Sequence, residues 1–324
     1  MIFESILIVV FALILDFTLG DPKNKYHPTA WTGKLVAKLV PFIKNDSQLL
    51  EKLGGIIVVL IVTSIVASLL VFLKLGLENL SVTYYIDLLV TVLVGGLLFK
   101  TTLAIKGMER HAIAVLSALE NGNLDDARTK LALIVKRNTK NLDKNHVLSG
   151  VLESVSENTV DGITAPLFYF ALLGLPGAFV YRTINTIDAM IGYKTIFFKN
   201  VGLFGANCDK VLNYIPARLT GFVMILSAMF LGENWKKSYQ IMKRDGKNTA
   251  SPNAGYPMAA LAGALGTKFE KIDHYSLGDG SLEFSKSHVE SAIKMMKVTS
   301  ILFSAMVTTP IIIALSYIGW WIHV

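Results

Sequence analysis

The feature of this sequence that most limits its fold is an uncharged run of 21 residues, Leu53–Leu73. A helix needs about 20 apolar residues to cross the hydrocarbon core of a bilayer, so this run is long enough to span one. The chain is 52% hydrophobic and only 17% charged, whereas soluble domains are nearer about 25% charged. The sequence therefore predicts an integral membrane protein.

Three further segments are apolar enough to be spans: Met1–Gly20, Ile86–Ala104 and Val298–Val324. The first lacks a basic leader and a small-residue cleavage site, so we interpret it as a retained anchor and not as a signal peptide. Two other segments are less regular. Gly162–Tyr181 contains Pro166 and Pro176, which predict a broken helix of the kind that lines a protein cavity at membrane depth. Val211–Leu231 is apolar around Arg218.

Charge indicates how the chain is oriented. Lys23–Lys52 contains six Lys against two acids, and basic loops remain preferentially on the cytoplasmic side. The net charge of +7 is therefore attributed to cytoplasmic loops and not to nucleic-acid binding. The single cysteine, Cys208, excludes an internal disulfide.

We predict an all-α, polytopic integral membrane protein with about four or five spans, partial or broken membrane helices and a cytoplasmic helical insert. The expected segments are N-terminal membrane helices at 1–105 with a cytoplasmic loop at 21–52, a cytoplasmic helical hairpin at 106–161, broken membrane segments at 162–232, a cytoplasmic polar region at 233–296 and a C-terminal membrane helix at 297–324.

An acidic stripe precedes the broken segment. Glu153, Glu157 and Asp161 are four residues apart, which places three carboxylates on one face of a helix. Like charges at this spacing destabilise a helix unless something positive faces them. Basic side chains, a metal ion or simple solvation of the stripe all remain open as explanations.

Four other polar clusters stand out. They are Asp21 with His27, then Arg182, Asn185 and Asp188 with Lys194 after them, then Asn213 with Arg218, and lastly Ser251 with Asn253. Each also has a plainer interpretation: the first as a turn, the second as an ion pair within a helix, the third as an arginine at the lipid interface and the fourth as an ordinary loop. No Walker-type phosphate loop is present.

Taken together, these motifs resemble the CobD/CbiB family of cobalamin biosynthesis, the adenosylcobinamide-phosphate synthases. The matching pieces run in order from residue 19 to residue 266. They are LGDP with the following His27-Pro28, ESVSENTVDGITAPLFY (153–169), NTIDAMIGYK (185–194), NYIPARLT (213–220) and SPNAGYPMAALAGALG (251–266). In one place this chain departs from the family, because it reads Lys136-Arg137-Asn138-Thr139 where the family commonly reads Gly-Arg-Asp-Thr.

The resemblance implies ATP-dependent formation of an amide between an aminoalcohol phosphate, of the aminopropanol or ethanolamine type, and a propionate of adenosylcobyric acid. ATP and Mg²⁺ would be required. The implied roles are proton transfer or catalysis by Asp21, His27, Glu157 and Asp161, metal binding by Glu153, Glu157, Asp161 and Asp188, and binding of substrate or phosphate by Arg182, Asn185, Lys194, Asn213, Arg218, Ser251 and Asn253.

The apolar runs and the basic loops predict a multi-pass protein of the cell membrane with polar loops mainly in the cytoplasm. Its expected partners are the lipid bilayer, further copies of itself or other membrane enzymes of the pathway, and no nucleic acid. Two alternatives remain: a non-catalytic membrane sensor or accessory protein like the distant relative AmpE, and a carrier for corrinoids.

Overall fold

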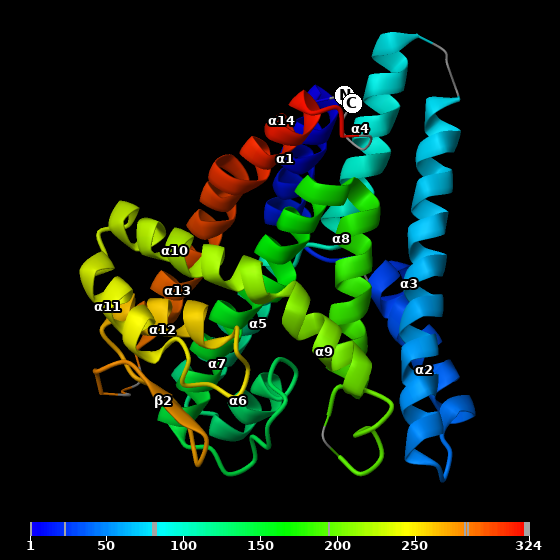
Figure 1. Cartoon of the computed structure of the whole chain (residues 1–324). Coiled ribbons are helices and arrows are strands. Elements are labelled where there is room, and N and C mark those ends of the chain that lie inside the picture. The colour runs from blue at the N-terminus through cyan, green and yellow to red at the C-terminus, as the bar shows by residue number, and fades with distance from the viewer. Residues whose placement is uncertain are drawn as a thin grey trace. The chain divides into compact units, whose positions relative to one another are not determined.

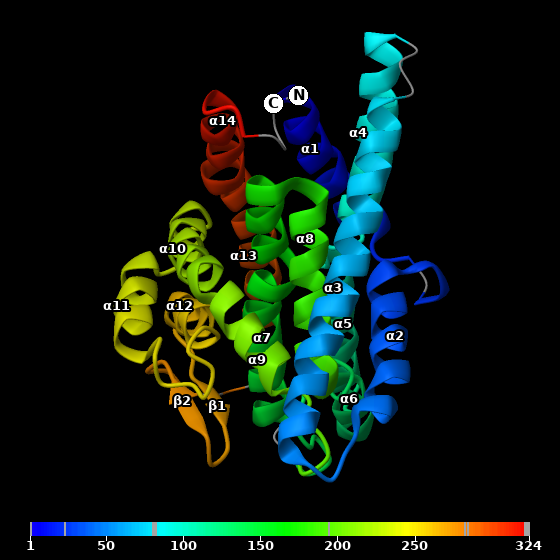
Figure 2. The same cartoon turned by 45° about the vertical axis from the view of Figure 1, so that its right-hand side comes forward.

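The computed structural model describes residues 2–22, 24–79, 83–193, 195–281, 283 and 285–320 (Figure 1, Figure 2). Within this part of the chain the regular secondary structure is helical except for one short hairpin, in keeping with the predicted all-α class. The helices are α1 (Ile2–Leu19), α2 (Pro28–Ile43), α3 (Gln48–Glu78), α4 (Tyr84–Lys100), α5 (Ile105–Glu120), α6 (Leu124–Leu131), α7 (Lys144–Thr159), α8 (Ala165–Ile191), α9 (Leu203–Leu212), α10 (Tyr214–Phe230), α11 (Trp235–Asp245), α12 (Gly255–Leu265), α13 (Lys286–Phe303) and α14 (Thr309–Tyr317). The strands are β1 (Phe269–Lys271) and β2 (Tyr275–Leu277), and the shorter turns are η1 (Asn24–Tyr26), η2 (Val160–Thr164) and η3 (Ser304–Thr308).

Among the described residues, five helical stretches are long and apolar enough to cross a membrane, which confirms the prediction of a polytopic membrane protein. The bent pair α9 and α10 makes a sixth if it forms one span. The five are Ile2–Leu19, Gln48–Leu77, Tyr84–Glu120, Lys144–Ile191 and Lys286–Tyr317.

The chain divides into two compact units. The first contains residues 1–103, 165–212 and 306–324, and the second contains residues 104–164 and 213–305. The continuous helical stretch of α7, η2 and α8 passes from the second unit to the first between Thr164 and Ala165.

Helices of the first unit pack through small residues and branched aliphatic side chains. A side chain at Gly96 of α4 would lie 2.4 Å from the Phe11 ring of α1, so only glycine permits this close approach. Helices α2 and α3 lie side by side in both views, and α3 packs on α8 (Figure 1, Figure 2). The core between them is built from fully buried residues such as Val36, Val62 and Ile187.

The break predicted in Gly162–Tyr181 is present in α8. Leu173 and Gly174 leave the helical region, Gly174 with a φ of 61°, and Pro176 follows with no backbone N–H to donate. The Trp320 Nε1 donates a hydrogen bond of 2.8 Å to the Leu172 carbonyl, one of the groups freed by the break. A membrane helix can therefore be interrupted here without leaving that carbonyl unsatisfied.

The predicted cytoplasmic loop at 21–52 is largely helical. Pro28 opens α2, where its fixed φ suits the first helical position. Gly33, Val36 and Val40 are buried along one face of α2, at spacings of three and four. The apolar periodicity was masked by the lysines on the opposite face, which led to the loop assignment.

In the second unit, the segment 106–161, for which the sequence predicts a helical hairpin, contains most of α5 and all of α6 and α7. Asn121-Gly122 forms the expected turn, with Gly122 at a φ of 71°. The side chain of Asn123 caps α6 by accepting a hydrogen bond of 2.9 Å from the Asp126 amide. Asp143 caps α7 in the same way, at 2.8 Å from the His146 amide.

Helices of the second unit are joined by buried hydroxyl pairs. The hydroxyls of Thr164 and Thr220 lie 2.6 Å apart, and those of Ser227 and Thr299 lie 2.9 Å apart. Paired hydroxyls of this kind connect helices in an apolar setting.

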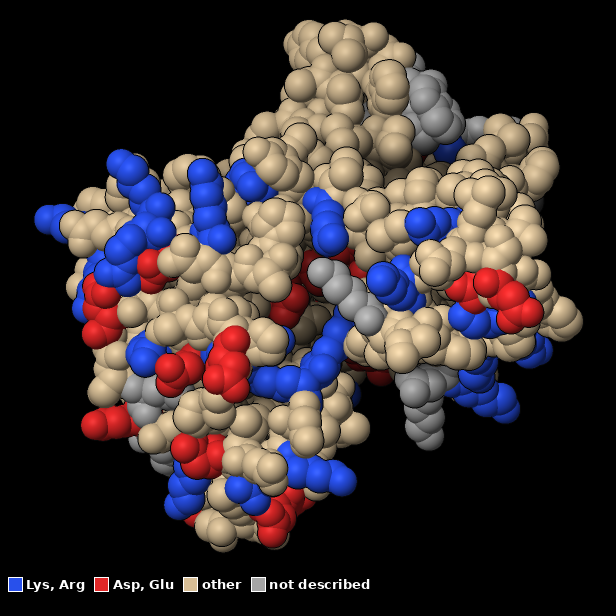
Figure 3. Space-filling model, turned by 60° about the horizontal axis from the view of Figure 1, so that its bottom comes forward, with Lys and Arg blue, Asp and Glu red and all other residues tan. Residues whose placement is uncertain are grey.

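Charged side chains gather on the face of the molecule shown in Figure 3, where Lys and Arg are interspersed with Asp and Glu as on a surface exposed to water.

Candidate functional site

The acidic stripe of α7 contains two carboxylates in different environments. Glu153 is 5% exposed and is surrounded by donors. Its Oε1 accepts 2.6 Å from the Ser149 hydroxyl and 3.0 Å from Arg137 Nη2, and its Oε2 accepts 2.7 Å from the Tyr275 hydroxyl. Glu157, one turn later, is exposed. Of the explanations left open for the stripe, a basic side chain applies at its first position, where Arg137 pairs with Glu153.

The hairpin β1–β2 brings Tyr275 to Glu153. The two strands are antiparallel, with Lys271 opposite Tyr275. The Glu270 amide donates 2.7 Å to the Ser149 hydroxyl, which attaches β1 to α7. Burial, then the charge of Glu153, raises the pKa of Tyr275 well above its usual range, so its hydroxyl remains a donor.

The departure from the family motif at residues 136–139 now has a physical description. Arg137, which the motif retains, forms the ion pair with Glu153. Asn138, which stands where the family commonly has Asp, accepts a hydrogen bond of 3.0 Å from the Lys140 amide through its side-chain oxygen. An aspartate would accept the same bond, because Asn and Asp form the same local turn. The substitution therefore leaves this turn intact.

Whether the acids of the stripe suit a metal ion depends on which of their oxygens already accept hydrogen bonds. Among the described residues, no three His, Cys, Asp or Glu side chains gather as a metal site. Glu153 does not fit, since Arg137, Ser149 and Tyr275 use both of its oxygens. Magnesium bound with a nucleotide needs only one or two carboxylates, because phosphates and water complete its shell. Exposed Glu157 and half-buried Asp161 fit that requirement.

Asp161 lies in an unusual backbone. Residues Val160–Thr164 form a π-helical turn, and such turns occur frequently at functional sites. The Thr164 hydroxyl donates 3.0 Å to the Thr159 carbonyl, five residues earlier, within this turn. The extra residue changes the register of the helix between the acidic stripe and α8.

Arg218 is held in a fixed orientation in the second unit. Its guanidinium carbon lies 3.4 Å from the centre of the Tyr214 ring and 4.5 Å from that of Tyr256. Its Nη1 donates 3.2 Å to the side-chain oxygen of Asn253, which is 5% exposed. Ser251 accepts from the amides of Asn253 and Ala254 at 3.3 and 3.4 Å. The structure thus brings Arg218, Ser251 and Asn253 together, although the sequence presents them as two separate clusters.

Asn213 also belongs to the second unit. It is 3% exposed and immediately precedes α10, where its side chain makes no capping hydrogen bond.

In the first unit, α8 places Arg182, Asn185 and Asp188 at successive turns. Arg182 Nη1 donates 3.1 Å to the Asn185 side-chain oxygen, and Asn185 Nδ2 donates 3.1 Å to Asp209 of α9. Asp209 was not identified from the sequence, since α9 carries no distinctive motif. Lys194 lies outside the described residues.

Asp21 and His27 come together just after α1. His27 Nε2 lies 3.8 Å from Asp21 Oδ1, and the Thr29 hydroxyl is hydrogen-bonded to His27 Nδ1. Asp21 Oδ1 is buried and accepts no hydrogen bond from the described residues. Since Thr29 engages Nδ1, Nε2 is the ring nitrogen that faces the aspartate.

Comparison with known proteins agrees with the sequence motifs. The model of the family described as CobD/Cbib protein matches residues 9–301. The probable cobalamin biosynthesis protein CobD of Methanothermobacter thermautotrophicus is 36% identical over 301 residues, which cover 93% of this chain and 96% of that protein. CobD of Leptospira interrogans is 36% identical over 302 residues, covering 91% and 94%.

The probable CobD of Methanocaldococcus jannaschii is 35% identical over 326 residues, covering 98% of each chain. No solved structure matches the chain. A family match over nearly the whole length, with relatives above 30% identity, confirms the resemblance seen in the motifs. The chain belongs to the CobD/CbiB family of cobalamin biosynthesis proteins.

Proposed function

We propose that this protein is an ATP-dependent carbon–nitrogen ligase that joins an aminoalcohol phosphate to a propionate of adenosylcobyric acid, giving adenosylcobinamide phosphate. Membership of the family supports the pathway. The observation that carries the reaction class is the fixed position of Arg218 between Tyr214 and Tyr256. A guanidinium held in this way is preorganised for phosphate, which both ATP and the aminoalcohol substrate present.

Activation of the propionate is the first step of the proposed reaction. A carboxylate oxygen attacks the terminal phosphorus of ATP, ADP leaves and an acyl phosphate forms. Magnesium supplies charge neutralisation on the phosphates when it is bound, and Glu157 with Asp161 would hold it. We assign Arg182, Asn185, Lys194, Asn213, Ser251 and Asn253 to binding of substrate or phosphate, and Asp188 to metal binding.

Formation of the amide is the second step. The amine nitrogen attacks the acyl carbon, inorganic phosphate leaves and the nitrogen gives up a proton. His27 Nε2 is the proposed acceptor. Asp21, 3.8 Å away, would stabilise the imidazolium that results or take the proton in its place.

The proposal also includes a location. Basic loops on one side of the predicted spans support a multi-pass protein of the cell membrane with its polar segments mainly in the cytoplasm. ATP and phosphorylated substrates would then reach the site from the cytoplasm.

The test uses Glu157→Gln in detergent-purified protein. We expect loss of ligation with unchanged chromatographic behaviour, because Glu157 is exposed and the substitution preserves its shape. Glu120→Gln is the matched control, since Glu120 is an exposed acid elsewhere in the same unit and should leave turnover intact. Wild-type turnover in Glu157→Gln would contradict the assignment of Glu157.

A further inference from the structure

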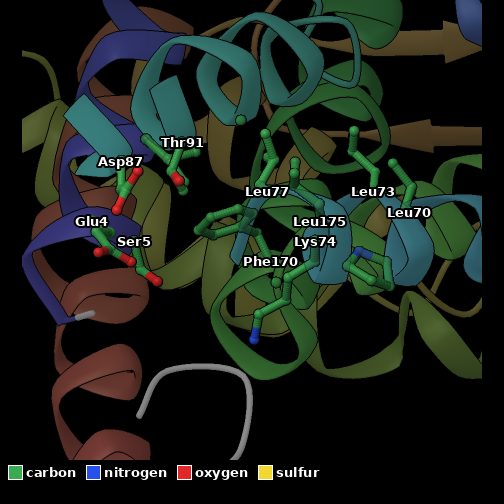
Figure 4. Close-up of a pocket in the computed structure, with 14 residues that line it drawn as sticks. Glu4, Ser5, Leu70, Leu73, Lys74, Leu77, Asp87, Thr91, Phe170 and Leu175 are labelled. Atoms are coloured by element: carbon green, nitrogen blue, oxygen red, sulfur yellow. The ribbon is translucent and has the colours of Figure 1, made fainter. Parts of the chain in front are cut away.

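The first unit contains a cavity that the proposed reaction does not use. It has a volume of about 180 Å³ and is lined by α1, α3, α4 and the broken part of α8 (Figure 4). The volume lies below the roughly 300–1,000 Å³ of sites that take drug-sized ligands, so it suits a headgroup and not a corrin ring. Every lining residue belongs to the first unit.

The cavity lies far from Asp21 and His27. Glu4 lines it from the first turn of α1, whereas Asp21 follows the other end of that helix. The 18 residues of α1 rise about 27 Å at 1.5 Å per residue, close to the roughly 30 Å of a bilayer core. Lys74 near the end of α3 and Asp87 in the first turn of α4 line the same cavity. The cavity therefore lies near the membrane face opposite Asp21 and His27.

Charged and apolar groups are separated within the cavity. Figure 4 shows the carboxylates of Glu4 and Asp87 on one side, from α1 and α4, with the Ser5 and Thr91 hydroxyls beside them. The amine of Lys74, from α3, lies apart from these carboxylates in this view. The rest of the wall is mainly apolar, from Leu70, Leu73, Leu77, Leu175 and Phe170.

The broken part of α8 forms one wall of the cavity. Gly174, Leu175 and Pro176 line the cavity, and the helix resumes after them. The start of a helical segment carries partial positive charge and favours an anion. The cavity thus offers two carboxylates for a cation, and a lysine with a helix start for an anion.

We propose that this cavity binds the headgroup of a phospholipid that carries a primary ammonium, with its phosphate toward Lys74 and its ammonium toward Glu4 and Asp87. A phosphate linked to an ammonium matches both signs of charge in the cavity. A free aminoalcohol phosphate shares this chemistry. The leucines of α3 favour the lipid, because they offer an apolar wall to an acyl chain at a bilayer face.

The test measures which lipid the protein retains. The full chain is reconstituted in vesicles of equal parts phosphatidylethanolamine, phosphatidylglycerol and phosphatidylcholine with identical acyl chains, and is then extracted with its nearest lipids for mass spectrometry. We expect enrichment of phosphatidylethanolamine by about tenfold, since one charge-assisted hydrogen bond is worth at least that factor. Enrichment of phosphatidylglycerol, or the bulk ratio of all three lipids, would overturn the proposal.

Two pairs of variants locate the effect. Glu4→Gln combined with Asp87→Asn should return the lipid ratio to that of the bulk, whereas Asp46→Asn, an exposed acid outside the cavity, should not. Leu73→Trp fills the cavity and keeps its charges, so it should also abolish the enrichment. Leu69→Trp is its control, because Leu69 is 64% exposed and does not line the cavity. Unchanged enrichment in the cavity variants would refute the site.

A competition experiment distinguishes the phospholipid from a free aminoalcohol phosphate as the occupant of the cavity. O-phosphoethanolamine added during extraction should leave the lipid enrichment unchanged, because it lacks the acyl chains. Displacement of the lipid by this free ester at equal concentration would refute the lipid as occupant. Ligation activity is not measured in this test, so its outcome is independent of the proposed reaction.

Discussion

The two carboxylates Glu153 and Glu157 are one helical turn apart, and the structure predicts opposite results for the same substitution. Glu153→Gln removes the charge that faces Arg137, and both side chains are largely buried, at 6% and 13% exposure. Breaking a buried pair typically costs about 3–5 kcal/mol, because the remaining charge has no partner. The amide oxygen of glutamine can still accept from Ser149 or Tyr275, so we expect the lower end, about 3 kcal/mol of unfolding free energy.

Glu157→Gln should change the unfolding free energy by less than about 0.5 kcal/mol, as expected for an exposed position. Its effect should appear instead in activity, as loss of ligation at ordinary Mg²⁺ concentrations and a raised Mg²⁺ requirement. The assay is equilibrium denaturation of detergent-solubilised protein by urea, followed by a Mg²⁺ titration of whatever activity remains.

The reasoning predicts that Glu153→Gln destabilises the protein without changing the Mg²⁺ requirement of its folded fraction. A stable Glu153→Gln protein with a raised Mg²⁺ requirement would refute the structural role given to Glu153. It would also restore that residue as a metal ligand.

Three further predictions rest on other parts of the structure. Arg218→Lys should raise the KM for the aminoalcohol phosphate by about tenfold or more, because lysine cannot reproduce the planar, stacked guanidinium; an unchanged KM would count against phosphate binding there. Arg244, by hydrogen bonding, holds the pKa of Asp245 below its usual range, so this pair stabilises the fold above about pH 4 and the contribution is lost as the pH falls through the folded pKa. Asp245→Asn should therefore flatten the acid limb of a stability–pH curve and cost about 1–3 kcal/mol at pH 7, and an unaltered acid limb would contradict this. Gly96→Leu should destabilise the protein by about 1–3 kcal/mol or more because its Cβ would lie 2.4 Å from an aromatic ring of α1, whereas Gly76→Leu, with nothing within 4 Å, should be tolerated in the same thermal assay.

Much of the fold was predictable because membrane spans depend on a local property, the length of an apolar run. Leu53–Leu73 forms the centre of α3, and α8 is broken at Gly174, two residues before Pro176, as expected. The helix α2 was missed because lysines on its exposed face concealed the apolar residues on its buried face. The segment boundaries proposed at 105, 161, 232 and 296 remain predictions.

The candidate site was less predictable, because its partners are distant in the sequence. Nothing in the local sequence of Tyr275 indicates that its hydroxyl meets Glu153, 122 residues earlier. Asp209 likewise meets Asn185 across 24 residues, by packing of α9 on α8. Spacing within one helix identified the acidic stripe. Only tertiary contacts distinguish Glu153, whose two oxygens both accept hydrogen bonds, from the exposed Glu157.

The central claim is that this chain catalyses ATP-dependent amide formation. The most direct measurement supplies purified, detergent-solubilised protein with adenosylcobyric acid, aminopropanol phosphate, ATP and Mg²⁺, and follows the corrinoid and nucleotide products by mass spectrometry. We predict one amide product for each ADP formed, in keeping with an acyl phosphate route. A folded protein that binds the corrinoid but forms neither the amide nor ADP or AMP would contradict the claim and favour a non-catalytic carrier.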